Sequence, residues 1–163
     1  MTALIGENTF AKARLLALLT PLTLLGGAYL SEYGFDLYPC EMCWWQRYPH
    51  FVALGLGLLA LLRPGSRGLV VLGGLAILSS GLIGAYHAGV EYHWWEGLTA
   101  CTSTADPNAA DPLAAILNAP LIRCDVAQWE LMGISLAGFN FLISTAAALV
   151  IFALLGRSRR RAA

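Results

Sequence analysis

The sequence predicts an all-α membrane protein, an antiparallel bundle of four transmembrane helices that forms a single domain over residues 1–163. The chain is 58% hydrophobic and only 12% charged, and its mean hydropathy is +0.64. A soluble domain carries about 25% charged residues, so this composition favours a membrane protein. The formal net charge is zero, and no basic surface suggests a nucleic-acid partner.

Four stretches lack Asp, Glu, Lys and Arg, and they are 15–31, 48–62, 68–90 and 131–156. A spanning helix needs roughly 20 apolar residues. The second stretch reaches that length only if residues 43–47 join it. We therefore predict helices over 14–33, 43–62, 68–90 and 131–156. The first could be a signal peptide, with Lys12 and Arg14 before it, but no Ala-x-Ala site follows, so we predict that it is retained.

The charged residues are sorted by position along the chain. Eight of the ten Lys and Arg residues precede the first helix, lie between the second and third, or follow the fourth, and nine of the ten acidic residues lie on the opposite side. Lys and Arg favour the cytoplasmic side of a membrane. Both termini are therefore predicted to be cytoplasmic, with outer loops at 34–42 and 91–130. The five tryptophans lie near the outer boundary, as an aromatic belt would, so we assign them no chemistry.

The connections complete the predicted fold. The inner turn RPGSR is short, which makes its two helices antiparallel neighbours. Gly81 and Gly84, together with Ser80, allow close helix packing. The long second outer loop contains a turn-rich segment over 102–112 and then the apolar run PLAAILNAPLI. That run is too short to span, so a short interfacial helix is expected over 113–122.

Four cysteines lie on the predicted outer side, where disulfides persist in an oxidising compartment. They allow three pairings, and the local pair Cys40–Cys43 leaves Cys101 with Cys124. A Cys101–Cys124 bridge would close a long loop and stabilise by roughly 3 kcal/mol, so it could be a structural staple. A Cys40–Cys43 bridge closes almost nothing, which favours a redox role. A helix N-terminus stabilises a thiolate, and Pro39 suits a helix start.

A metal site is the alternative reading of the cysteines. Four thiolates could bind one zinc ion tetrahedrally. The spacing lacks the second tight pair that is usual in zinc ribbons. No histidine directly follows Cys43, so c-type haem attachment in its usual form is excluded.

Arg47 lies four residues after Cys43, hence on the same helix face. It is either an anchor that snorkels to the interface or a donor to a polar ligand and a positive field on the Cys43 thiolate. No flavin or nicotinamide fingerprint is present, so a membrane quinone is the expected electron acceptor. Arg47 and His87 are candidate donors to its carbonyl oxygens. His87 could also be merely interfacial, and His50 and His93 have weaker claims.

Three segments resemble the disulfide bond formation protein B (DsbB) family, the quinone-reducing thiol oxidases of bacterial inner membranes. They are PCEMCWWQR, AYHAGVEYHWWEG with Cys101 after it, and RCDVAQWELMGISL. Four cysteines, four spans and this order together are specific, whereas a bare Cys-x-x-Cys would be a weak signal. Vitamin K epoxide reductase has similar chemistry, but its Cys-x-x-Cys lies late in the chain.

The resemblance implies a role for each site residue. Cys101 and Cys124 would form the disulfide that oxidises a periplasmic thioredoxin-like (DsbA-like) partner, with Cys101 taking the mixed disulfide. Cys40–Cys43 would reoxidise that pair. Cys43 would face a ubiquinone or menaquinone and form a thiolate–quinone adduct or charge-transfer complex, and Arg47 and His87 would assist. The enzyme would support protein disulfide formation from the inner membrane. Two other functions stay open: a zinc-binding membrane protein and a purely structural membrane partner.

Overall fold

The computed structural model describes residues 2–98, 102–103, 111 and 121–160. Within these residues it has four long helices, which are α1 (Thr2–Phe35), α2 (Glu41–Leu62), α3 (Arg67–Glu91) and α5 (Leu136–Arg160). Two short antiparallel strand pairs lie between α3 and α5 in the chain, β1 (Thr102–Ser103) with β2 (Leu121–Ile122), and β3 (Glu130–Leu131) with β4 (Ile134–Ser135). The described part of the chain is therefore almost entirely helical, as the sequence predicts.

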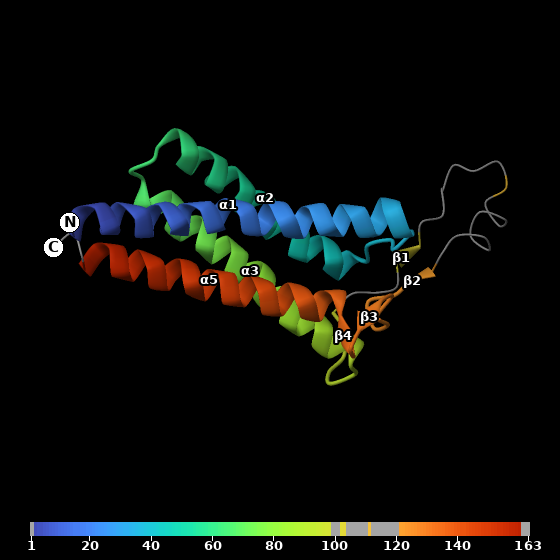
Figure 1. Ribbon diagram of the computed structural model, residues 1–163. Helices are drawn as coiled ribbons and strands as arrows, with labels where there is room; N and C mark the ends of the chain where they lie inside the picture. Colours follow the sequence, from blue (N-terminus) through green and yellow to red (C-terminus); the bar gives the residue numbers. More distant parts are fainter. Residues whose placement is uncertain (1, 99–101, 104–110, 112–120, 161–163) are drawn as a thin grey trace.

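The four helices form one bundle in which chain neighbours are also neighbours in space. α1 packs against α2, α2 against α3, α3 against α5, and α5 closes the ring against α1. α1 begins and α5 ends at the same end of the bundle, and the α2–α3 turn lies toward that end too (Figure 1). The strand pairs lie at the opposite end. Short connections between antiparallel helices produce this arrangement.

Three of the four helices are long and apolar enough to cross a membrane, namely Asn8–Phe35 of α1, the whole of α3, and Leu136–Arg159 of α5. The chain is thus a multi-pass membrane protein. α2 is long but does not meet the same criterion, because its first half carries Gln46, Arg47 and His50. All three side chains are buried inside the bundle. That α2 also crosses the membrane stays a prediction.

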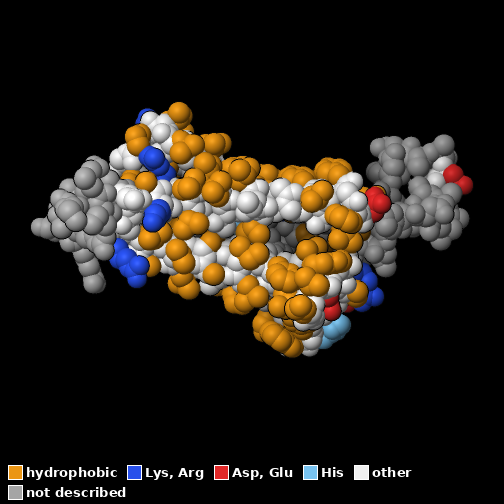
Figure 2. Space-filling view, viewed as in Figure 1, with side chains coloured by type: hydrophobic (Ala, Val, Ile, Leu, Met, Phe, Trp, Pro, Cys, Tyr) orange, Lys and Arg blue, Asp and Glu red, His pale blue; other side chains and the backbone are white. Residues whose placement is uncertain are grey.

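The outer surface of the bundle is suited to lipid. Figure 2 shows hydrophobic side chains along the middle of the molecule, most of the basic side chains at the end that carries the termini, and acidic side chains with a smaller basic group at the opposite end. Large exposed apolar side chains come from all four helices, among them Leu22, Leu58, Leu72, Leu82, Leu142, Leu149 and Val150. In water such a surface would be costly, whereas the hydrocarbon core of a bilayer matches it.

Small residues let α3 and α5 approach closely, as predicted. A Cβ atom added at Gly81 would lie 2.8 Å from Oγ1 of Thr145, and one at Gly84 would lie 3.0 Å from both the carbonyl oxygen of Ala137 and Nδ2 of Asn140. Glycine at these positions therefore sets the helix separation. At Gly84 it also leaves room for a polar side chain from the facing helix.

Two outer-end features differ from the predicted bounds. The fourth helix begins at Leu136 rather than at 131, because the β3–β4 hairpin occupies the intervening residues. Its turn places Met132 and Gly133 in left-handed backbone conformations, with φ of 54° and 76°. The predicted interfacial helix over 113–122 lies outside the described residues except at its end, where Leu121–Ile122 form β2.

Candidate active site

The Cys-x-x-Cys pair sits at the start of α2, and Cys40 caps that helix. The backbone N–H of Cys43 donates to Sγ of Cys40 over 3.3 Å, and the two sulfurs are 2.9 Å apart. No disulfide joins the two residues in this structure. Cys40 is buried, whereas Cys43 is half-buried in the first turn of the helix. The helix N-terminus favours negative charge at these sulfurs, as the Cys-x-x-Cys spacing predicts.

A third cysteine from the outer loop joins this pair. Cys40 forms side-chain hydrogen bonds with Cys124 and with Cys43, and these bonds together with burial raise the pKa of the Cys40 thiol. Cys124 is itself buried and packs with Ile122 of β2 and Val90 of α3. Loop and helix thus bring together three of the four predicted redox cysteines. Cys101 lies outside the described residues.

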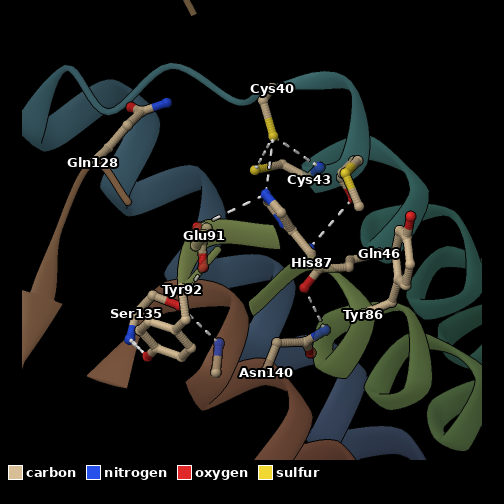
Figure 3. A network of polar contacts seen from close by, with 12 residues as sticks. Cys40, Cys43, Gln46, Tyr86, His87, Glu91, Tyr92, Gln128, Ser135 and Asn140 are labelled. Atoms are coloured by element: carbon tan, nitrogen blue, oxygen red, sulfur yellow. Dashed lines mark hydrogen bonds and ion pairs between the residues drawn. The ribbon is translucent and has the colours of Figure 1, made fainter. Parts of the chain in front are cut away.

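His87 of α3 links the cysteines to a polar network, and its tautomer follows from its neighbours. The Gln46 amide nitrogen donates to the carbonyl oxygen of Met42 and lies 2.8 Å from Nδ1 of His87. Nδ1 must therefore accept, so a neutral ring carries its proton on Nε2. Nε2 lies 3.6 Å from Sγ of Cys40 and 3.7 Å from Oε1 of Glu91 (Figure 3).

Glu91 extends the network toward the outer end of the bundle. Its side chain is only 7% exposed, and its Oε2 accepts a hydrogen bond from Oγ of Ser135 in β4. Tyr92 fixes this strand, because its hydroxyl accepts from the N–H of Ser135 over 2.9 Å and donates to the carbonyl of Gly133 over 3.0 Å. An ionisable residue buried at the end of a spanning helix is by default a functional candidate.

Arg47 is also buried, but its charge is paired. Its guanidinium donates to Oε2 of Glu32 over 2.6 Å and to the carbonyl oxygen of Ala28 over 3.3 Å. The same group lies 4.9 Å from the ring centroids of Tyr29 and Trp44. The Arg47 side chain is only 8% exposed and the Glu32 side chain only 13%. The pairing ties α2 to α1, and it weakens the positive field that the sequence predicts at Cys43.

One cavity of about 250 Å³ connects these groups. Its polar lining includes Cys40, Cys43, Gln46, Arg47, His50, His87, Glu91 and Asn140. Apolar and small residues of α1 and α5 supply most of the remaining wall, among them Leu24, Leu25, Ala28, Leu136 and Phe139. We call this space the main cavity. Mostly apolar walls with a few convergent polar groups are typical of sites for small organic molecules.

A second polar cluster lies deeper in the bundle, beyond Gln46. Nδ2 of Asn140 donates to Oε1 of Gln46 over 2.8 Å and to the carbonyl oxygen of Ser80 over 3.1 Å. Oδ1 of Asn140 lies 3.0 Å from Nε2 of His50, and it also accepts from Oγ of Ser144 over 2.9 Å. Hydrogen bonds therefore run without a break from His50 to His87.

Comparison with known proteins assigns the chain to a family. The family model described as disulfide bond formation protein DsbB matches residues 11–154. The chain belongs to the DsbB family. It is also 25% identical over 145 residues to the uncharacterized protein RP370 of Rickettsia prowazekii (strain Madrid E), covering 86% of this chain and 84% of that protein. No solved structure matches.

DsbB-family membership makes this chain a membrane disulfide oxidoreductase, and it confirms the resemblance seen in the sequence. Of the predicted site residues, the structure brings Cys40, Cys43, Cys124 and His87 together and places Arg47 on the same cavity. Sequence reasoning missed the network residues Gln46, Glu91 and Asn140. A polar residue inside an apolar stretch was the available signal for Gln46 and Asn140.

Proposed function

We propose that this DsbB-family chain is a thiol:quinone oxidoreductase of the bacterial inner membrane. It reoxidises a periplasmic thioredoxin-like (DsbA-like) dithiol and passes the electrons to a membrane quinone, either ubiquinone or menaquinone. The sorting of charge supports the orientation, because the basic end of the bundle suits the cytoplasm and the cysteine end then faces the periplasm (Figure 2).

The observation that carries the proposal is that Cys40 hydrogen-bonds both Cys43 and Cys124. One sulfur is thus shared between the helix pair and the loop cysteine. In thiol–disulfide exchange a thiolate attacks one sulfur of a disulfide and the other sulfur leaves. A Cys124 thiolate that attacks Cys40 would form a Cys40–Cys124 bond, break the Cys40–Cys43 bond and release Cys43 as thiolate.

The relay has three steps, and each step transfers two electrons and two protons. The partner dithiol first reduces Cys101–Cys124 and becomes a disulfide. The resulting thiols then reduce Cys40–Cys43 and return to the disulfide. Finally the Cys40 and Cys43 thiols become a disulfide again, and the quinone substrate becomes hydroquinone.

The main cavity fits a quinone as the electron-accepting substrate. Cys43 lies on its wall, so a sulfur borders a mostly apolar space inside a membrane protein. Arg47 lines the same space, and its guanidinium has five N–H donors. Two of them donate to Glu32 and to the carbonyl oxygen of Ala28. The sulfur would supply electrons, the apolar walls would exclude water, and Arg47 would orient a carbonyl oxygen.

His87 and Glu91 are placed to handle the proton of Cys40. Nε2 of His87 lies between Sγ of Cys40 and Oε1 of Glu91. Hydrogen bonding keeps the Cys40 thiol protonated by raising its pKa, so the thiol needs a base before it can act as a thiolate. Because Nε2 of His87 already carries a proton, His87 can donate to the sulfur once it is a thiolate, and we assign the role of base to the carboxylate of Glu91 beside it. His87 therefore serves Cys40 more directly than it serves the quinone.

Trapping the exchange intermediate tests the proposal. A partner that keeps only its attacking cysteine stays joined to Cys101, because it has no second thiol to resolve the mixed disulfide. The Cys124 thiolate released by that step should attack Cys40 of the Cys40–Cys43 disulfide, so a Cys40–Cys124 disulfide should accumulate with Cys43 as a free thiol. Peptide mass spectrometry after acid quenching would detect it. A Cys124→Ser variant serves as the control and should show no such link. Linkage of Cys40 to any other cysteine instead would contradict the relay.

A thiolate metal site is the second candidate function, and one observation favours it. The ligand atoms of Cys40, Cys43 and His87 all lie within 4.8 Å of one another. Thiolate and imidazole ligands are those that zinc prefers. Metal analysis of gently purified protein decides between the two: stoichiometric zinc whose loss accompanies loss of reactive thiols favours the metal site, and metal-free protein with full quinone turnover excludes it.

A further inference from the structure

Gln128 joins the loop that carries Cys124 to the coil that leads into Cys40. Its side-chain amide nitrogen donates to the backbone carbonyl oxygen of Tyr38 over 2.6 Å, and Figure 3 shows the amide beside that coil. Gln128 lies four residues after Cys124, and Tyr38 lies two residues before Cys40. The bond therefore closes a short ring of residues around the contact between Cys124 and Cys40.

Other contacts fix the segments at both ends of this bond. The backbone N–H of Leu37 donates to the carbonyl oxygen of Ser31 over 3.1 Å, which holds the coil to the end of α1. Trp129, the residue after Gln128, packs on Phe139 of α5 with their ring centroids 6.2 Å apart. The amide of Gln128 thus connects two anchored segments, so its bond sets where the loop lies relative to the coil.

The position of Cys124 decides which sulfur of the Cys-x-x-Cys pair it meets. The sulfurs of Cys40 and Cys43 are only 2.9 Å apart, so a small displacement of the loop would present Cys124 to the other one. In the structure Cys124 and Cys40 share one buried cluster, and Cys43 packs against its edge. His87 hydrogen-bonds the backbone of Cys124 from α3, and Gln128 fixes the same loop from the coil. Access of this kind sets which sulfur of a disulfide is attacked.

We propose that Gln128 is a positioning residue of the relay, whose hydrogen bond to the carbonyl oxygen of Tyr38 directs the Cys124 thiolate to Cys40 rather than to Cys43. This inference rests on the proposed relay between the two cysteine pairs. In the directed step a Cys40–Cys124 bond forms, the Cys40–Cys43 bond breaks, and the electron pair leaves on Cys43 as a thiolate. Attack on Cys43 would instead release Cys40 and hold Cys43 in a disulfide, where it could not supply electrons to the cavity.

Exchange among three cysteines tests the proposal without a partner protein or a quinone. In a Cys101→Ser background, quinone-free protein with one disulfide places that disulfide between any two of the remaining cysteines, and exchange at mildly alkaline pH equilibrates the three forms. Acid quenching and peptide mass spectrometry then give the ratio of Cys40–Cys124 links to Cys43–Cys124 links. With Gln128 in place we expect the Cys40–Cys124 link to dominate.

Three substitutions separate the hydrogen bond from the bulk of the side chain. Gln128→Met keeps the length and removes the donor, so the ratio should fall about fivefold, the effect of one neutral hydrogen bond. Gln128→Lys supplies a donor again and should restore the ratio. Asp125→Asn is the matched control, because it weakens the pair with Arg123 in the same loop and should leave the ratio unchanged. A merely structural role of Gln128 would lower stability without changing the ratio.

The outcomes separate this inference from the proposed function. Equal amounts of the two links with Gln128 in place would overturn the inference even if the substituted proteins fail to fold. An unchanged ratio in Gln128→Met would also overturn it, as would an equal fall in Asp125→Asn. In each of these cases Cys124 still exchanges with the pair, so the proposed function stands. If Cys124 forms no link with either cysteine of the pair, the relay itself fails.

Discussion

The side-chain amide of Gln46 donates a hydrogen bond to Nδ1 of His87 over 2.8 Å. This single contact decides which nitrogen of His87 carries the proton, and it points that proton at Cys40 and Glu91. The pairing also joins α2 to α3 directly behind the Cys-x-x-Cys motif. The redox centre is therefore connected to the membrane interior through a glutamine.

Replacing Gln46 with leucine should release His87 from its fixed tautomer. We expect the exchange between the two cysteine pairs to slow by about tenfold to a hundredfold, the usual effect of losing the partner that orients a functional histidine. Stopped-flow measurement of the exchange gives the rate, and nitrogen chemical shifts of the His87 ring report the tautomer. Gln46→Glu is the matched control, because its carboxylate accepts from Nδ1 and should reverse the ring. Unchanged ring shifts in both variants would contradict this assignment.

Replacing Glu91 with glutamine should remove the base behind His87 while keeping the shape of the site. We expect the exchange step to slow by about a hundredfold, a typical contribution of general acid–base catalysis, and the affinity for quinone to stay unchanged. Rapid-mixing thiol assays and quinone titrations measure the two quantities separately. Ser135→Ala removes only a donor to this carboxylate and should have a smaller effect. Equal rates in the Glu91→Gln and unsubstituted proteins would remove Glu91 from the mechanism.

The thiol of Cys40 should resist alkylation in the reduced protein at neutral pH. Its hydrogen bonds to Cys124 and Cys43, together with burial, raise its pKa, and only the thiolate reacts. Its iodoacetamide reaction should therefore begin to accelerate at a higher pH than that of an ordinary cysteine, whose pKa is about 8.5. In Cys124→Ala the profile should move to lower pH. Peptide mass spectrometry at a series of pH values gives the profile, and identical profiles in both proteins would mean that Cys124 does not bond Cys40.

The raised pKa of the Cys40 thiol also makes the stability of the fold depend on pH. Because the folded protein retains the Cys40 proton at pH values where the unfolded chain has lost it, the folded state binds more protons there. The free energy of unfolding should therefore fall as the pH rises above about 8.5, and the contribution is fully present below that value.

Removing the carboxylate of Glu32 should destabilise the protein, because Arg47 is left charged and buried. We expect Glu32→Gln to lower the free energy of unfolding by about 3 kcal/mol, as when one member of a buried ion pair is lost. Titration with a denaturing detergent measures it. The double variant Glu32→Gln/Arg47→Gln removes both charges and should recover much of the loss. If the single variant is as stable as the unsubstituted protein, Arg47 does not depend on Glu32.

Much of the fold follows from the sequence because a bilayer restricts what a chain can do. Long uncharged stretches and sorted charges are enough to predict four helices and their antiparallel order. The start of α5 could not be predicted, because the β3–β4 hairpin depends on a left-handed Gly133 and on Tyr92 from another helix. α2 is less apolar than the three helices that are apolar enough to span a membrane, because its polar residues line the cavity.

The redox cysteines were predictable because their spacing itself carries the chemistry. The contact between Cys40 and Cys124 was not, because it requires the outer loop to fold back onto the start of α2. The partner of Arg47 was also hidden, since Glu32 lies on a different helix. His50 and Gln46 are four residues apart and so share a helix face, which could have signalled a polar stripe inside the bundle.

Anaerobic quinone reduction tests the central claim most directly. Catalytic amounts of oxidised protein in detergent are mixed with a reduced thioredoxin-like periplasmic oxidase and a soluble ubiquinone analogue, and the quinone absorbance is followed. The account predicts repeated turnover that is lost in Cys43→Ser and in Cys101→Ser. Turnover that survives in Cys43→Ser, or no quinone loss in a protein that holds stoichiometric zinc, would contradict it.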